Sequence, residues 1–192
     1  LFFWVVAALA AYEWAGLIGL EGVPRRFTYV GLFGLLAALA WWALQGWFGV
    51  GLWVGAGMWL AAAVIVMSYP RGSEPIANPW IAGGIGLIIL LAAWIALIVI
   101  RAEPGENGAN WLLWLLMLVW GADIGGYFVG RQFGRRKLAL AVSPGKTWEG
   151  AIGGLILSLI VCGISLLLLG YSAWWLATIA GLVVVSVVGD LF

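Results

Sequence analysis

The residues with the clearest capacity for chemistry lie in one polar stretch, Ser143-Pro144-Gly145-Lys146-Thr147-Trp148-Glu149-Gly150. Lys146 offers a positive charge, Ser143 and Thr147 offer hydroxyl donors, and the Pro-Gly pair predicts a turn. We expect Glu149 to begin the next helix, where a carboxylate interacts favourably with the helix dipole. Such a turn suits anionic phosphate oxygens, so the stretch predicts a site that handles a charged head group.

The Gly145-Lys146-Thr147 segment invites comparison with a Walker A phosphate loop. That motif requires a glycine five residues before Gly145, but position 140 is Leu. We also expect no strand before the segment. A P-loop NTPase is therefore excluded, and any phosphate binding here must use another geometry.

The composition places the polar stretch in a membrane protein. Hydrophobic residues make up 65% of the 192 residues, charged residues 9%, and the mean hydropathy is +1.12, values far outside those of soluble domains. A hydrocarbon core of about 30 Å requires roughly 20 apolar residues per helix. His is absent and Cys162 is the only Cys, which excludes an internal disulfide and any zinc site built from His or Cys.

Seven apolar stretches without period-2 alternation predict transmembrane helices rather than barrel strands. They are roughly 1–20, 27–44, 47–67, 80–100, 111–129, 151–169 and 173–188. The predicted fold class is all-α, a polytopic transmembrane helix bundle of about seven helices. We expect residues 1–192 to be a single transmembrane domain, truncated at both ends, with a cytoplasmic loop at 130–150.

The basic residues predict the orientation of the chain in the membrane. Alternating the loops places eight of the nine Lys and Arg residues on one side and only Arg101 on the other. By the positive-inside bias, the side with eight is cytoplasmic. Five basic residues against one acidic residue in the loop 131–149 could also simply bind anionic lipid and fix the topology.

Carboxylates inside the apolar stretches are candidates for function. Asp123 is seven residues before Gly130, roughly 10 Å inside the cytoplasmic boundary at about 1.5 Å per residue. An Asp near a helix centre costs on the order of 3 kcal/mol, so it should face a polar cavity or a cation. Asp190 and Glu13 lie on the same side. A helix–helix hydrogen bond or an ion pair with a loop Arg remains an alternative for each.

Glycines near Asp123 predict close helix packing. Gly121, Gly125, Gly126, Gly130 and Gly134 include three pairs spaced by four, and the same spacing recurs at 150 and 154. Small residues at this spacing let transmembrane backbones approach closely. The pair at 125 and 126 could instead open room for a ligand.

Four blocks in fixed order resemble the bacterial phosphatidate cytidylyltransferases, also called CDP-diacylglycerol synthases. The blocks are Gly121-Ala122-Asp123-Ile124-Gly125-Gly126-Tyr127, Gly130-Arg131-Gln132-Phe133-Gly134, Lys137-Leu138-Ala139 and the stretch Ser143 to Gly150. Segments 11–14 and 189–191 are also similar, so the resemblance spans nearly the whole chain. The family's diagnostic Asp-Arg-x-Asp stretch would begin after Phe192, and we therefore expect a fragment that is inactive alone.

The resemblance implies that CTP and phosphatidate react to give CDP-diacylglycerol and diphosphate, with Mg²⁺ as cofactor, in a bacterial inner membrane. It implies that Lys146 and Asp123 are catalytic and that Asp123 and Asp190 hold Mg²⁺. The implied substrate-binding residues are Ser143, Thr147, Glu149, Arg131, Arg135 and Arg136.

Two other functions remain open at this point. A CTP-dependent isoprenoid-alcohol kinase, acting on a polyprenol or phytol, would share a basic cytoplasmic loop, and a membrane transporter would also place carboxylates and glycines inside a helix bundle. The expected partners are CTP, phosphatidate and membrane lipid, with no nucleic acid, and a homodimer is possible.

Overall fold

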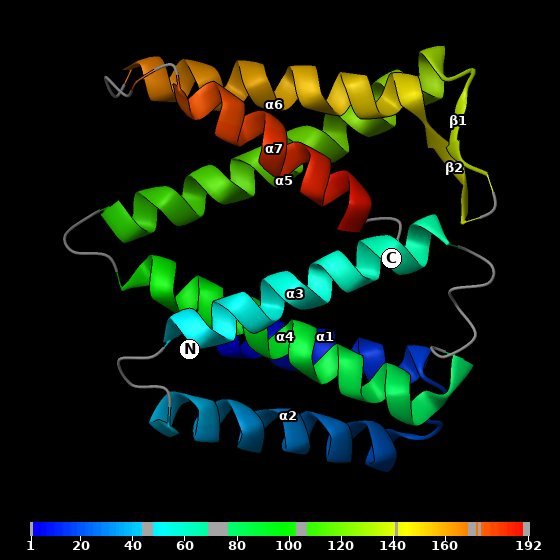
Figure 1. Cartoon of the computed structure of the whole chain (residues 1–192), viewed down its shortest axis with the longest axis vertical. Coiled ribbons are helices and arrows are strands. Elements are labelled where there is room, and N and C mark those ends of the chain that lie inside the picture. Colours follow the sequence, from blue (N-terminus) through cyan, green and yellow to red (C-terminus); the bar gives the residue numbers. More distant parts are fainter. Residues whose placement is uncertain are drawn as a thin grey trace. The chain divides into compact units, whose positions relative to one another are not determined.

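The chain folds into seven helices and one β-hairpin within the residues that the computed structural model describes, namely 2–43, 48–68, 77–102, 107–140, 142–168, 172 and 174–189 (Figure 1). Each predicted apolar stretch contains one helix, so the helical prediction is confirmed. The elements are α1 (Phe2–Leu17), α2 (Val23–Ala43), α3 (Phe48–Met67), α4 (Pro79–Arg101), α5 (Asn107–Phe133), β1 (Lys137–Ala139), β2 (Ser143–Thr147), α6 (Trp148–Leu168) and α7 (Trp174–Gly189).

Four helices among the described residues are long and apolar enough to cross a membrane. They are Val23–Ala43, Pro79–Arg101, Gly108–Phe133 and Trp148–Leu166. Among the described residues, the helices α1, α3 and α7 also contain apolar segments, but these segments are shorter. Long helices satisfy their own backbone hydrogen bonds in lipid, and the chain is a multi-pass membrane protein.

The chain forms two compact units, Leu1–Pro104 and Gly105–Phe192. In the first unit, α1 contributes buried alanines and α2 contributes Tyr29 and Phe33 to a core that also holds Trp94 of α4. The Tyr29 hydroxyl donates to Gly83 O at 2.8 Å, which ties α2 to α4 by a buried hydrogen bond. The sequence predicted a single domain. That the two units associate as one domain stays a prediction.

The second unit is built on the contact between α5 and α6. One face of α6 carries small or buried residues every four positions, namely Gly150, Gly154, Ser158, Cys162 and Leu166. The opposite face carries exposed apolar residues at the same spacing, namely Ile152, Ile156, Ile160, Ile164 and Leu168. The first face therefore packs against protein, whereas the second suits lipid.

A hydrogen bond joins α5 to α6, and glycines without side chains allow the two helices to pack closely. The Ser158 hydroxyl donates to Leu118 O at 2.9 Å. A Cβ placed on Gly125 would lie 2.5 Å from Gly153 O, and one on Gly154 would lie 2.5 Å from Ala122 O. The predicted close packing of glycines is therefore confirmed at these positions.

A β-hairpin joins α5 to α6, where the sequence predicted a polar loop with a turn at Pro144 and Gly145. That prediction is wrong, because both residues lie in β2, which pairs antiparallel with β1. The expectation that no strand precedes Gly145 is also wrong. Pro lacks an N–H, but both strands of a two-stranded sheet are edge strands, so the hairpin can accommodate it.

We predict that Gly154→Ala lowers the melting temperature of the purified protein in detergent. The new methyl group would overlap Ala122 O, and overpacking of this kind costs about 1–3 kcal/mol. Gly181→Ala on α7 is the matched control, since a Cβ there meets nothing within 4 Å. A thermal shift assay in which both variants melt like the parent would contradict the close packing of α5 and α6.

Candidate functional site

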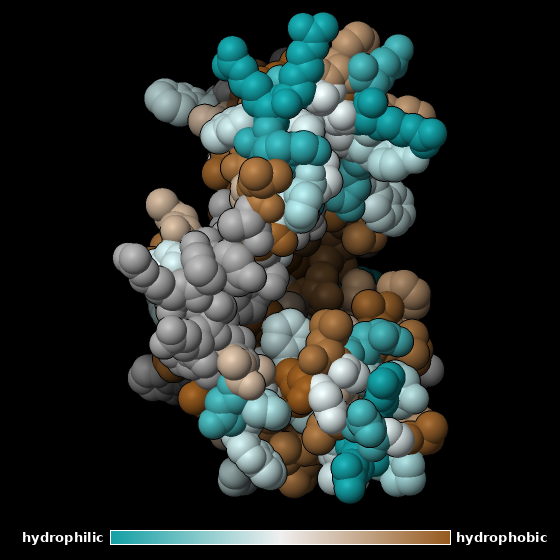
Figure 2. All heavy atoms as spheres, turned by 90° about the vertical axis from the view of Figure 1, so that its right-hand side faces the viewer, coloured by the Kyte–Doolittle hydropathy of each residue, from teal (hydrophilic) through white to brown (hydrophobic). Residues whose placement is uncertain are grey.

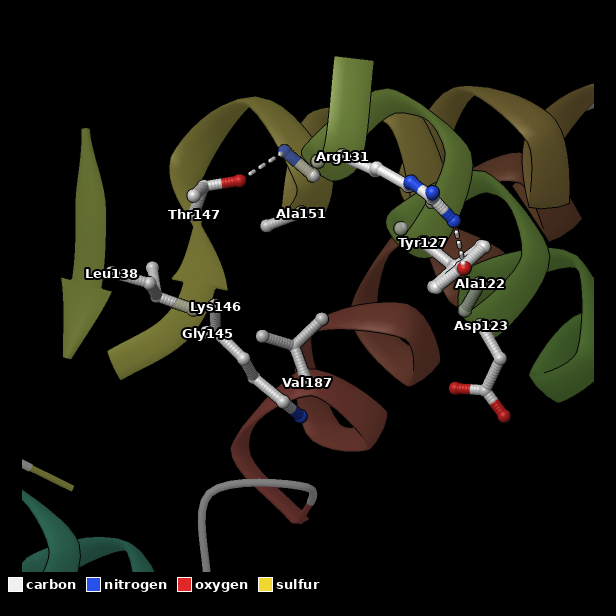
Figure 3. A pocket seen from close by; sticks show the side chains of 14 residues that line it. Ala122, Asp123, Tyr127, Arg131, Leu138, Gly145, Lys146, Thr147, Ala151 and Val187 are labelled. Carbon is white, nitrogen blue, oxygen red and sulfur yellow. Dashed lines mark hydrogen bonds between the residues drawn. The ribbon is translucent and has the colours of Figure 1, made fainter. Parts of the chain in front are cut away.

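A pocket of about 400 Å³ lies within the second unit (Figure 3). Its walls come from α5, the hairpin, the start of α6 and the end of α7. The lining residues are Ala122, Asp123, Gly126, Tyr127, Gly130, Arg131, Leu138, Gly145, Lys146, Thr147, Gly150, Ala151, Gly154 and Val187. The helix α5 and the polar stretch 143–150, which are separate segments of the sequence, thus line one cavity.

Glycines from two helices line the pocket. Gly126, Gly130, Gly150 and Gly154 all line it, and they come from the two helices that pack most closely. A Cβ on Gly126 would meet nothing nearer than Gly150 O at 3.7 Å, unlike one on the neighbouring Gly125. Adjacent glycines on α5 therefore differ: a Cβ on Gly125 would collide with the backbone of α6, whereas a Cβ on Gly126 would make ordinary contact.

Lys146 and Asp123, the two residues predicted to be catalytic, line this same pocket. Lys146 is half-buried on β2, whereas Asp123 is exposed on α5. Figure 3 shows the Lys146 side chain reaching past Val187 of α7 and the Asp123 carboxylate extending from α5. The pocket lining therefore includes both a cation and a carboxylate.

Arg131 supplies a second cation to the lining, and it is held by a residue to which the sequence gave no role. Its Nη1 atom donates to the Tyr127 hydroxyl at 2.7 Å, and its guanidinium carbon lies 5.9 Å from the centre of that ring (Figure 3). Residues four apart on a helix are neighbours, so the spacing of Tyr127 and Arg131 was the available signal.

Thr147, the last residue of β2, lines the pocket and also caps the N-terminus of α6. Its buried Oγ1 accepts a hydrogen bond from Gly150 N at 3.2 Å, which is the bond of an N-cap residue (Figure 3). The side chain fills space left by glycines, because a Cβ on Gly130 or Gly134 would lie 3.2 Å or 2.9 Å from the same oxygen. Its hydroxyl hydrogen can still be donated to a ligand oxygen.

Four other predicted substrate-binding residues lie outside the pocket lining. Ser143 lies at the start of β2, opposite Ala139. Arg135 and Arg136 are exposed in the turn between α5 and β1, and Glu149 contacts their backbone. Their predicted contacts with substrate stay predictions.

The basic residues near the pocket form a hydrophilic end of the second unit. Exposed side chains of Arg131, Arg135, Arg136 and Lys137 gather around the hairpin, and Figure 2 shows hydrophilic side chains over this end. Positive charge at the mouth of a cavity attracts anionic ligands and anionic lipid.

A metal ion would find few protein ligands in the described residues. No group of three His, Cys, Asp or Glu side chains comes together there, and Asp123 supplies the one carboxylate among the residues that line the pocket. Asp190, the second predicted metal ligand, lies outside the described residues. A single carboxylate nevertheless fits Mg²⁺, which is commonly bound by one or two carboxylates together with substrate phosphates.

Comparison with known proteins agrees with the resemblance read from the motifs. The sequence model of the cytidylyltransferase family matches residues 1–192. A phosphatidate cytidylyltransferase of Pseudomonas aeruginosa is 41% identical over 171 residues, covering 81% of this chain and 56% of the relative. Another from Haemophilus influenzae is 36% identical, covering 66% of this chain and 40% of the relative.

A more distant relative, a phosphatidate cytidylyltransferase of Bacillus subtilis, is 31% identical over 108 residues, with coverage of 54% and 39%. The chain spans about half the length of the curated relatives it matches. No solved structure matches it. Because the family model covers every residue, the chain belongs to the cytidylyltransferase family.

Proposed function

We propose that this chain forms part of a phosphatidate cytidylyltransferase, which converts CTP and phosphatidate to CDP-diacylglycerol and diphosphate. The observation that carries the proposal is the pocket in the membrane-embedded second unit, whose lining includes Lys146, Arg131 and Asp123. The family and the names of the relatives support the same reaction.

The reaction requires little general-base catalysis, because the nucleophile is a lipid phosphate oxygen that is already anionic. This oxygen attacks the α-phosphorus of CTP and forms a new P–O bond. The bond from the α-phosphorus to the oxygen that bridges it to the β-phosphate breaks, and diphosphate leaves with the electron pair. The main obstacle is the repulsion between two anions, so cationic groups should carry most of the catalysis.

The described residues supply such groups from two elements. Lys146 on β2 would contact the phosphates of CTP as a point charge, and Thr147 would donate its hydroxyl hydrogen there. Arg131 on α5 would bind the second anion, with its guanidinium oriented by Tyr127. A guanidinium suits two phosphate oxygens at once, which favours a phosphate group as its ligand.

Mg²⁺ would be held by Asp123 and phosphate oxygens, and by Asp190 if that residue approaches the pocket, and would neutralise charge on the triphosphate. Asp123 lies within a helix that is long enough to cross the membrane. A cation or a polar ligand would offset the cost of a carboxylate at this depth. We propose that the pocket opens to the cytoplasm of a bacterial cell, because the exposed basic residues lie beside it.

We predict that Lys146→Ala in the intact protein lowers kcat/KM for CTP by about 100-fold, as expected when one preorganised charge contact to a transferring phosphoryl group is lost. Lys146→Arg should retain part of the activity because the positive charge remains. Arg25→Ala is the control for the loss of one positive charge, since Arg25 is exposed on α2 in the first unit and does not line the pocket. An unchanged rate for Lys146→Ala would refute the assignment.

The same assay separates the alternative chemistries when the CTP is labelled. Cytidylyl transfer releases diphosphate and leaves cytidine monophosphate on the lipid, whereas an isoprenoid-alcohol kinase would release CDP. Transport of substrate by proteoliposomes in the absence of CTP would instead favour a transporter.

We predict that Tyr127→Phe raises the KM for phosphatidate about two- to fivefold with little change in kcat. The substitution keeps the ring under the Arg131 guanidinium and removes one hydrogen bond at an exposed site, which is worth about 0.5–1 kcal/mol. Steady-state kinetics in mixed micelles would measure this. Trp120→Phe on the same helix is the control, because Trp120 is exposed and does not line the pocket. An equal change in both variants would contradict a specific role for Tyr127.

A further inference from the structure

The carboxylate of Glu149 binds the backbone of the turn that leads from α5 into the hairpin. Its Oε2 atom accepts hydrogen bonds from Arg135 N and from Arg136 N, both at 3.1 Å, and its Oε1 atom accepts from Arg136 N at 3.3 Å. The donors are main-chain amides, so the contact does not depend on the two arginine side chains. Glu149 itself lies in the first turn of α6.

Further contacts close the base of the hairpin on both strands. Trp148 N donates to Arg136 O at 2.9 Å, and Lys137 of β1 lies opposite Thr147 of β2. Glu149 lies on α6, which follows β2 directly. Its hydrogen bonds therefore hold the residues just before β1 to this helix. Lys146 is the residue immediately before this closed base.

The hairpin needs such an anchor because it is weak by itself. It has three residues in β1 and five in β2, with a register shift between Lys137 and Ala139. An isolated two-stranded hairpin is marginally stable at best in water. Without the carboxylate, the amides of Arg135 and Arg136 would lose their acceptor, and β1 would be held to α6 only by the bond from Trp148 N to Arg136 O and by its pairing with β2.

We infer that Glu149 is a positioning residue, which holds the hairpin to α6 so that Lys146 stays in the pocket. The inference rests on the proposed function, and it changes the expectation that Glu149 contacts substrate. Glu149 is not among the lining residues, and its two oxygens already accept hydrogen bonds from within the chain.

Replacement by Gln separates positioning from a role that needs the negative charge. Glu149→Gln can place its amide oxygen where Oε2 lies and so keep both bonds of 3.1 Å, losing only the bond of 3.3 Å from Arg136 N. Glu149→Ala loses all of them. If the carboxylate bound a metal ion, Gln and Ala would both be defective, because neither supplies a negative charge.

The first experiment measures hydrogen exchange of the amides at 135 and 136 in the intact protein, in lipid nanodiscs without substrate. We expect exchange at least about tenfold faster in Glu149→Ala, because the donors lose their acceptor, and within about threefold of the parent in Glu149→Gln. Amides of α4 serve as the internal reference for folding. Unchanged exchange in Glu149→Ala, or equal acceleration in both variants, would overturn the inference.

The second experiment is a double-mutant cycle on CTP turnover with Glu149→Ala and Lys146→Ala. If Glu149 acts through Lys146, the double variant should be little worse than Lys146→Ala alone, whereas independent residues would have additive effects. Glu149→Gln should keep kcat/KM for CTP within about threefold of the parent, since two of its three bonds remain. Additive effects would overturn the inference.

Failure of the proposed function would instead be seen as absence of CTP turnover in the parent, and the exchange experiment would still decide the role of Glu149.

Discussion

The close contact between α5 and α6 is the constraint on which the second unit depends. Lipid provides no hydrophobic driving force between helices, so their association relies on packing and on hydrogen bonds such as that from Ser158 to Leu118 O. Glycines allow this contact, and at the end of the two helices they also line the pocket. The hairpin spans that end because it connects the C-terminus of α5 to the N-terminus of α6. The position of Lys146 is therefore set by how closely two helices approach.

The helices could be predicted from the sequence because their signal is simple. An apolar run in lipid must satisfy its backbone internally, so length and hydropathy identify it, and all seven runs contain helices. The hairpin could not be predicted in the same way. Its strands have three and five residues, Pro144 and Gly145 favour turns, and no apolar alternation marks them. These strands form between two long helices that hold both ends of the hairpin. A local sequence pattern does not carry this tertiary information.

The lining of the pocket could be predicted only in part. Lys146, Thr147, Arg131 and Asp123 were selected for their chemistry, and the structure brings all four into one lining. Tyr127 was missed because an aromatic residue in an apolar helix is usually packing or a lipid contact. Glu149 was selected for its charge, but its partners are backbone amides, which carry no sequence signature. Sequence reasoning thus finds side chains that act by charge more easily than those that hold a backbone.

The glycine wall of the pocket links the shape of the cavity to the stability of the protein. A Cβ on Gly150 would lie 2.9 Å from Gly126 O and 3.1 Å from Thr147 Oγ1. The same methyl group would therefore press on the backbone of α5 and disturb the cap of α6. At Gly150 and Gly154 the wall cannot gain a methyl group without straining the helix contact that supports it, whereas Gly126 has room for one. Changes in substrate preference are then easier to reach through the hairpin and the exposed face of α5 than through the glycines.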